Sequence, residues 1–207
     1  MENTVTITAT GHVEALPDKV KIEIEVPAEA DTAHETRQAV NDHENRLRDA
    51  LLTETSLSKN QIRATGFQVR HREDQFDPGQ IESEYRAVKE FQVHTQPERT
   101  GDIIVTATDA GASIQYVEFS LTESTRTGLE EEALKHAAEN ARQKAETLVQ
   151  AEDATVGPVS KLEESEPSGM QTIVDDALQA GSDTDFQPTP ISVSVEIKAT
   201  YELVQNS

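Results

Sequence analysis

Strict alternation of apolar and polar residues near the start of the chain is the feature that most constrains its fold. In residues 19–26 every second side chain is a valine or an isoleucine, and lysines and glutamates stand between them. Residues 5–10 alternate in the same way, with threonine at the polar positions. Because successive side chains of a β-strand point to opposite faces, both runs are predicted to be strands with one buried face. Pro17 and Asp18 lie between the runs, and we expect the two strands to pair across this corner.

Helix signals follow the second strand. Thr32 precedes Glu35 by three residues, which is the spacing of a capping box, and Val40, Leu47 and Leu51 then recur at helical spacing. We therefore predict a helix over residues 32–53 that buries this stripe. Residues 62–72 and 85–95 are predicted to be two further strands that pair with each other. A glycine at position 66 predicts a bulge in the first of them.

The second half of the chain begins with a predicted short helix from Pro97 through Ala107. It is expected to end at Gly111, because glycine suits the left-handed conformation that follows many helices. A strand over residues 113–121 comes next. The residues from Thr127 to Glu130 have the spacing of a second capping box, which predicts a long helix over residues 129–150. Its mostly small apolar stripe would let it lie close to a sheet and consists of Leu129, Ala133, Leu134, Ala137, Ala141, Ala145 and Leu148.

Two more strands complete the predicted fold. Residues 159–164 form a weak candidate, whereas residues 191–203 show the cleanest alternation in the chain. Together the elements predict an α+β fold, with antiparallel or mixed sheet structure packed against two long helices. A chain of 207 residues can bury a sizeable core, and we expect one domain over residues 1–207.

In order and spacing these elements resemble the SIMPL domain family over nearly the whole chain. The resemblance rests on Gly11 with Pro17-Asp18, the strand over 62–69, Tyr85-Arg86-Ala87, Asp109-Ala110-Gly111-Ala112, Phe119-Ser120-Leu121, residues 137–145 and residues 191–203. It implies an α+β domain with antiparallel strands packed on helices. It also implies possible assembly, since some members form large homo-oligomers. Reported associations include outer-membrane antigens, oxidative-stress phenotypes and a kinase-associated signalling protein, none of which supplies a catalytic motif to carry over.

The chain is strongly acidic, with 39 Asp and Glu against 18 Lys and Arg and a net charge of −21. Nucleic acid is disfavoured as a partner, because binding it requires Lys/Arg patches that neutralise phosphates. The carboxylates are spread through predicted strands, helices and loops. This spread favours a surface adapted to a salt-rich, halophile-type cytoplasm over a dedicated cation-binding surface, since a Debye length of about 3 Å at about 1 M salt screens like charges.

The sequence contains no cysteine, which excludes disulfides, thiolate metal sites and a cysteine nucleophile. The first strand follows Met1-Glu2-Asn3-Thr4 directly, and no run approaches the roughly 18 apolar residues needed to span a bilayer. We therefore expect a cytoplasmic protein without a membrane span. Residues 165–190 are rich in Asp, Ser, Pro, Gly and Gln, and are expected to form a mobile acidic insertion or, less favoured, a partner-docking loop.

Every resemblance to a metal-binding motif is incomplete. His34-Glu35 begins a zinc-protease pattern, but Gln38 stands where the second histidine is required. His136 and Glu139 share a helix face, yet such a site needs matching motifs on other helices. The run Asp183-Thr184-Asp185 resembles the start of a calcium loop without its glycine turn.

The other candidates are interpreted as structural. His43 is in register with the buried stripe of its helix, and His71 and His94 fall on opposite faces of their predicted strands. The sequence has neither a glycine-rich phosphate loop nor a Gly-x-Ser-x-Gly elbow. We therefore predict no catalytic, cofactor-binding or metal-binding residue, and no cofactor.

These patterns favour a non-catalytic assembly or interaction module that forms a homo-oligomer, with a stress-related role implied by the resemblance alone. The alternative is a small-molecule or metal-binding stress protein, and a hydrolase with an unrecognised site is less favoured. A convergent pocket with two or more shielded titratable groups would favour the alternatives, whereas a broad apolar or edge-strand contact would favour assembly.

Overall fold

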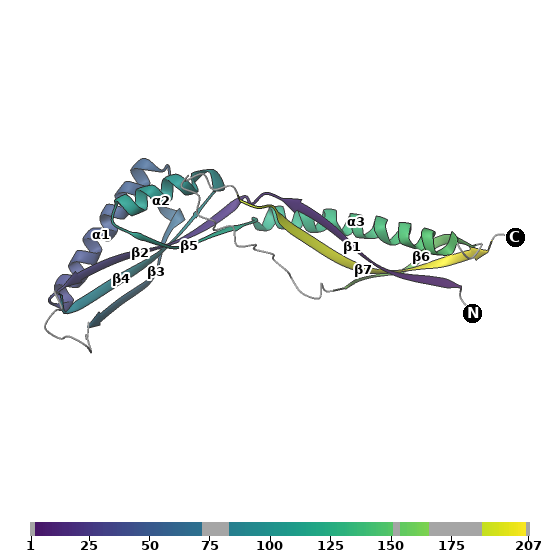
Figure 1. Cartoon of the computed structure of the whole chain (residues 1–207), viewed down its shortest axis with the longest axis horizontal. Helices are drawn as coiled ribbons and strands as arrows, with labels where there is room; N and C mark the ends of the chain where they lie inside the picture. The colour runs from purple at the N-terminus through teal and green to yellow at the C-terminus, as the bar shows by residue number, and fades with distance from the viewer. Residues whose placement is uncertain (1–2, 72–82, 151–153, 166–187, 206–207) are drawn as a thin grey trace. The chain divides into compact units, whose positions relative to one another are not determined.

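The chain folds into two compact units, each built on its own antiparallel sheet (Figure 1). The computed structural model describes residues 3–71, 83–150, 154–165 and 188–205. Unit 1 takes its described residues from the ranges 1–16, 121–178 and 189–207, and unit 2 from 17–120 and 179–188. The expectation of one domain over residues 1–207 stays a prediction. Apart from its two ends, the expected insertion over residues 165–190 lies outside the described residues.

Unit 1 has a three-stranded sheet in the order β1-β7-β6. Its strands are β1 (Thr4–Ala15), β7 (Ile191–Gln205) and β6 (Ala154–Ser165). The ladder between β1 and β7 runs without a register shift, whereas the ladder between β6 and β7 shifts on both sides of Val159. Helix α3 (Glu123–Val149) lies mainly along β1 and β7 (Figure 1).

The last strand of the chain confirms the predicted alternation. In β7 every second side chain from Val193 to Tyr201 is buried. The predicted pairing of the first two strands is wrong, because β1 pairs with β7 in unit 1 while the next strand belongs to unit 2. Alternation marks a strand with one buried face, but it does not specify the partner strand.

The predicted start of the long helix is also wrong. Helix α3 begins at Glu123 rather than Leu129, and its N-cap is Thr122, whose hydroxyl oxygen accepts from the backbone N–H of Thr125 at 3.4 Å. Thr127 and Gly128 therefore lie inside the helix. Thr122 provides the side-chain oxygen that a helix start needs, so the later capping-box pattern does not mark the boundary.

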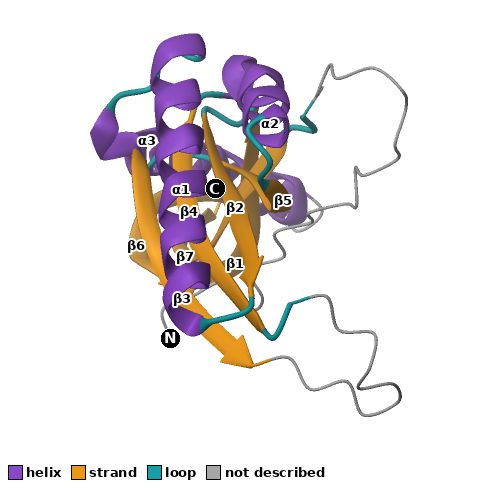
Figure 2. Ribbon diagram, turned by 90° about the vertical axis from the view of Figure 1, so that its left-hand side faces the viewer, coloured by secondary structure: helices purple, strands orange, loops and turns teal. Residues whose placement is uncertain are grey.

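Unit 2 has a four-stranded sheet in the order β3-β4-β2-β5. The strands are β2 (Lys19–Ala30), β3 (Ile62–His71), β4 (Tyr85–Thr95) and β5 (Ser113–Ser120). Helices α1 (Ala33–Glu54) and α2 (Thr100–Asp109) contact each other and cover one face of the sheet (Figure 2). The 3-10 turns η1 (Lys59–Gln61) and η2 (Pro97–Arg99) precede β3 and α2.

Most local predictions for unit 2 are confirmed. Thr32 caps α1 by accepting from the backbone N–H of Glu35 at 3.2 Å, and the stripe of Val40, Leu47 and Leu51 is fully buried. The register of β3 against β4 shifts at Gly66, as expected for a bulge. Gly111 follows α2 with a φ of 85°, a left-handed conformation that glycine adopts without strain.

Candidate functional site

Small residues allow α3 to lie directly on the backbone of β1. Along α3 the side chains of Ala133, Ala137, Ala141 and Ala145 are fully buried. A Cβ atom added to Gly11 would lie 2.0 Å from the carbonyl oxygen of Ala133 and 2.4 Å from the backbone nitrogen of Ala137. The helix backbone therefore occupies the space that a side chain at position 11 would need, and this contact fixes α3 over β1.

Polar side chains of α3 follow the free edge of β1. The side-chain amide of Asn140 donates to the carbonyl oxygen of Thr10 at 2.9 Å, and the ammonium of Lys144 donates to that of Thr8 at 3.4 Å. One turn earlier, Nδ1 of His136 lies 3.4 Å from the carbonyl oxygen of His12. We call these three side chains, His136, Asn140 and Lys144, the donor series.

The spacing of the donor series follows from backbone geometry. Four helix residues advance about 6 Å, and two strand residues advance about 6.7 Å, so one helical turn matches each second residue of β1. The carbonyl oxygen of Asn3 accepts from the N–H of Leu203 in β7 at 2.8 Å. The backbone N–H and C=O groups of odd-numbered β1 residues therefore point toward β7, and those of even-numbered residues point to the outer edge of the sheet. The donor series thus covers carbonyl groups that an edge strand otherwise leaves unpaired.

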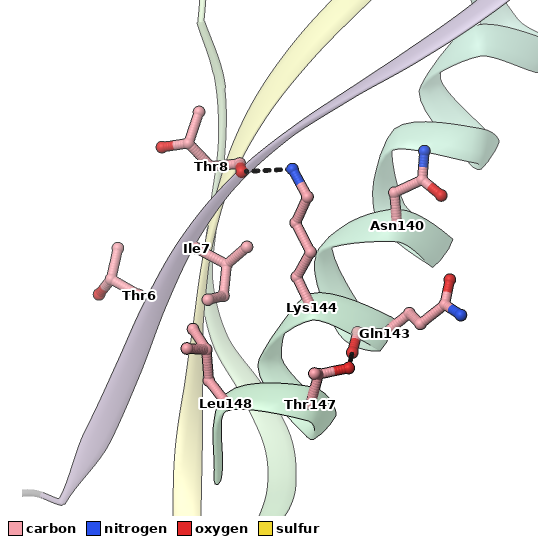
Figure 3. Close-up of a pocket in the computed structure, with 8 residues that line it drawn as sticks. All are labelled: Thr6, Ile7, Thr8, Asn140, Gln143, Lys144, Thr147 and Leu148. Carbon is pink, nitrogen blue, oxygen red and sulfur yellow. Dashed lines mark hydrogen bonds between the residues drawn. The ribbon is translucent and has the colours of Figure 1, made fainter.

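The donor series ends at Lys144. Leu148 occupies the next position in the same spacing. This residue would face the backbone of Thr6, but its side chain has no donor, and it is 58% exposed. A groove of about 550 Å³ lies here between β1 and α3 (Figure 3). It is lined by Thr6, Ile7, Thr8, Asn140, Gln143, Lys144, Thr147 and Leu148.

The chemistry of the groove is that of a strand edge. Its lining combines hydroxyl and amide groups, the aliphatic Ile7 and Leu148, and the outward backbone of Thr6. Lys144 is the one lining residue with an ionisable side chain, and Figure 3 shows it reaching Thr8. Such a groove can accept an extended backbone and an apolar side chain. Its lining does not bring together the two shielded titratable groups that would favour a catalytic or metal-binding pocket.

The histidines singled out in the sequence take separate places. Nδ1 of His43 lies 2.9 Å from the carbonyl oxygen of Pro27, which agrees with a structural role at the edge of the core. His71 packs edge-on against Tyr85 with ring centroids 5.0 Å apart. It lies at one end of the β3–β4 ladder and His94 beyond the other end, so the two rings do not converge.

The metal-like motifs do not assemble into a centre in the described ranges. His34 is exposed at the start of α1, and His136 belongs to the donor series. The run Asp183-Thr184-Asp185 lies outside the described residues. Within those residues, no group of three or more His, Asp and Glu side chains is placed to hold a metal ion.

Sequence reasoning missed the groove and the donor series. The contacts join residues more than 120 positions apart, and no local pattern predicts which strand edge α3 follows. The one available signal was the recurrence of polar side chains every fourth residue at positions 136, 140 and 144. Without the register of β1, this recurrence reads as an ordinary solvated helix face.

A family model described as SIMPL, a protein of unknown function (DUF541), matches residues 5–201 of the chain. This range begins in β1 and ends in β7. A search of curated proteins finds no match. Among the helices of the described residues, none combines the length and the apolar character that a membrane crossing requires.

Proposed function

We propose that this chain, which belongs to the SIMPL family of proteins of unknown function, is a non-catalytic assembly module whose copies join through the free edge of β1. The observation that carries the proposal is the groove at Leu148, where the donor series stops short of Thr6 and the outward backbone of Thr6 has no partner among the described residues. An edge strand with unpaired backbone groups is a template for pairing with another chain.

The four sheet edges differ in how well they suit such pairing. The ladder of β1 with β7 is continuous over twelve residues. On its outer edge the donor series occupies the carbonyl groups of Thr8, Thr10 and His12, so the stretch around Thr4 and Thr6 is left for pairing. By contrast, β6 contains Gly157 and Pro158 and shifts register twice, and β3 bulges at Gly66. The remaining edge strand, β5, has eight residues and an irregularity in its ladder with β2. Bulges and prolines protect an edge from further pairing, so β1 is the favoured interface.

Charge favours a second copy as the occupant of this edge. The chain carries a net charge of −21, so most surfaces of two copies repel each other. Residues 3–11 contain no Asp, Glu, Lys or Arg, and their outward backbone groups belong to Thr4, Thr6, Thr8 and Thr10. Antiparallel pairing of residues 4–6 from two copies would therefore place neutral residues opposite each other about a two-fold axis, which is the symmetry of an isologous dimer.

The test compares two substitutions at one position. Thr6→Pro removes the outward N–H of Thr6, whereas Thr6→Val keeps that N–H and nearly preserves the side-chain shape. Light scattering in molar potassium chloride should show an oligomer for the wild type and for Thr6→Val, and a smaller species for Thr6→Pro. Hydrogen exchange of β7 should remain protected in both variants, which shows that unit 1 is still folded.

Two outcomes would contradict the proposal. A wild-type chain that stays monomeric across micromolar concentrations would reject assembly altogether. An oligomer that survives Thr6→Pro with unit 1 folded would reject the β1 edge as the interface.

A salt-adapted surface and a cytoplasmic location belong to the same proposal, and the net charge of −21 supports the first of them. Raising potassium chloride to about 1 M should raise the melting temperature, because screening weakens repulsion among the carboxylates. Equal melting temperatures in dilute and molar salt would contradict the salt-adapted reading.

A further inference from the structure

A group of cations gathers at one end of the sheet face that α1 and α2 leave open in unit 2. Lys21 of β2 is directly opposite His94 of β4, and Arg63 of β3 is directly opposite Gln92, two residues before His94. Lys19 precedes Lys21 by two residues in β2. Because residues opposite each other and residues two apart share a face, all five side chains lie on the same side of the sheet.

His94 lies at the centre of this group. Residues directly opposite have Cβ atoms about 5 Å apart, and diagonal neighbours are about 7–8 Å apart. By the observed register, Lys21 is directly opposite His94, and Lys19 and Arg63 are its diagonal neighbours on the two flanking strands. Three strands thus place positive charge around one imidazole.

Only one of the three cations has a carboxylate partner among the described residues. Lys21 forms salt bridges with Glu118 of β5 at 2.6 Å and with Glu23 at 3.5 Å. Neither Lys19 nor Arg63 makes a salt bridge to a side chain in the described ranges. Most of the described Lys and Arg side chains likewise make no salt bridge, so what distinguishes Lys19 and Arg63 is their position beside a histidine with a buried, unpartnered Nδ1.

The imidazole of His94 is half-buried. Nε2 of His94 lies 3.1 Å from the side-chain oxygen of Gln92, an acceptor to which a protonated Nε2 can donate. Nδ1 is buried and has no hydrogen-bond partner among the described residues. Burial, followed by the positive charges of Lys19, Arg63 and Lys21, lowers the pKa of His94 below its ordinary value.

We propose that Lys19, Arg63 and His94 form a binding site for a small multivalent oxyanion of the phosphate or sulfate type. The planar guanidinium of Arg63 can donate to two oxygens of such an anion, and the ammonium of Lys19 can donate to a third. Donors from two flanking strands suit a tetrahedral ligand better than a single carboxylate. This site lies in unit 2 and is independent of the β1 edge.

Binding of the anion should be coupled to protonation of His94. A negative charge over the site offsets the positive charges of Lys19 and Arg63 and stabilises the imidazolium, so the anion should raise the pKa of His94. The carboxylates nearest by register, Glu118 and Glu23, are held by Lys21, and Glu90 lies four residues from His94 along β4. By register, Glu90 is a diagonal neighbour of Arg63 and Glu118 a diagonal neighbour of Lys19, but neither pair forms a salt bridge in the described ranges.

The experiment follows the histidine side chains of the full chain by NMR, with His94→Gln used to assign the His94 signal. Sulfate is the first probe because its charge does not change near neutral pH, inorganic phosphate the second, and sodium chloride at matched ionic strength the reference. We expect sulfate and phosphate to raise the pKa of His94 saturably, and by more than chloride does. His71, on the other face of the sheet, should respond equally to all three salts.

The variants separate a built site from general screening. Lys19→Gln/Arg63→Gln should lose the oxyanion-specific shift, and the exposed Arg63→Gln alone should weaken it several-fold. Arg70→Gln/Lys198→Gln removes the same charge away from the site and should keep the shift. Equal effects of sulfate and chloride on His94, or an oxyanion-specific shift that persists in folded Lys19→Gln/Arg63→Gln, would overturn the proposal.

Discussion

Both units pack helices against one face of an antiparallel sheet, but unit 1 does so mainly with small side chains and unit 2 with large ones. Unit 1 packs α3 on its sheet through alanines and Gly11, with Ile7, Val195 and Ile197 as its larger aliphatic side chains. Unit 2 packs α1 and α2 on its sheet through large residues, and its most deeply buried members include Phe91, Ile22, Ile24, Leu47, Leu51 and Ile103.

This difference decides which substitutions each unit tolerates. In unit 1 the helix touches the strand backbone, so added volume has nowhere to go. In unit 2 each large side chain fills space between the layers, so lost volume leaves a cavity. The first unit should therefore be sensitive to enlargement and the second to truncation.

The polar contacts between helix and sheet differ as well. In unit 1 the donor series binds strand carbonyls directly. In unit 2 the carboxylate of Glu44 on α1 joins Lys89 of β4 and Arg48, whose guanidinium lies 5.1 Å from the ring centroid of Phe91. Burial alone would raise the pKa of Glu44, but the hydrogen bonds from Lys89 and Arg48 lower it overall.

The largest expected effect is that of Gly11→Ala in unit 1. The new methyl would collide with the backbone of Ala133 and Ala137, and helix backbone cannot rotate away as a side chain could. We expect a loss of more than about 3 kcal/mol, above the usual cost of overpacking. Hydrogen exchange should show early opening of β1 and β7. Gly128→Ala is the matched control, because a Cβ at position 128 meets nothing within 4 Å. If the Gly11→Ala variant were as stable as the wild type, the close contact between α3 and β1 would be refuted.

Leu47→Ala should produce the corresponding loss in unit 2. Leu47 is fully buried, so its truncation should lower the free energy of unfolding by about 2–5 kcal/mol. Denaturant unfolding followed by exchange of β2 and β4 measures the loss. Leu148→Ala, at an exposed position of α3, should change stability by less than about 0.5 kcal/mol. Comparable losses in the two variants would contradict the assigned core.

The features of the fold that can be predicted from the sequence are those set by residues close together in the chain. The period of Val20, Ile22, Ile24 and Val26 and the stripe of α1 are local patterns, and both mark buried faces correctly. The partner of β1 is set by residues nearly 200 positions away, where complementary alternation fits many strands equally well. The division into two units follows from that pairing and was equally hidden.

The candidate site was harder to predict than the fold. Gly11 was part of the family resemblance, but its role depends on where the backbone of α3 lies, which the alanine stripe could suggest only in general terms. The groove lies where Leu148 follows the donor series without a side-chain donor of its own. The donor series can be recognised only once the register of α3 along β1 is known. Two leucines placed on the buried stripe by their spacing are not buried there: Leu134 is only partly buried, and Leu148 is 58% exposed.

Asn140→Ala tests the donor series at a smaller scale. It removes the shortest of the three contacts and leaves the carbonyl of Thr10 to water, so we expect a loss of about 1 kcal/mol. Exchange near β1 should rise while unit 2 is unchanged. Asn41→Ala offers a control, because Asn41 bonds Lys89 in unit 2 and its removal should leave β1 unaffected. If both variants raise hydrogen exchange near β1 equally, the side chains of α3 do not protect the backbone of the β1 edge.

The smallest expected effect is a pH dependence confined to unit 2. Because the pKa of His94 is lowered from 6.5, mainly by burial, the unfolded chain binds this proton more readily than the folded chain does. The stabilising contribution is therefore present above pH 6.5 and is lost as pH falls through the lower folded value. In bis-tris buffer without multivalent anions, exchange in β4 should increase below pH 6.5 in the wild type and less so in His94→Gln. Carboxylates titrate in both variants alike, so their difference isolates the histidine. An identical pH profile for wild type and His94→Gln would mean that neither burial nor the surrounding cations lower the pKa of His94 in the folded chain.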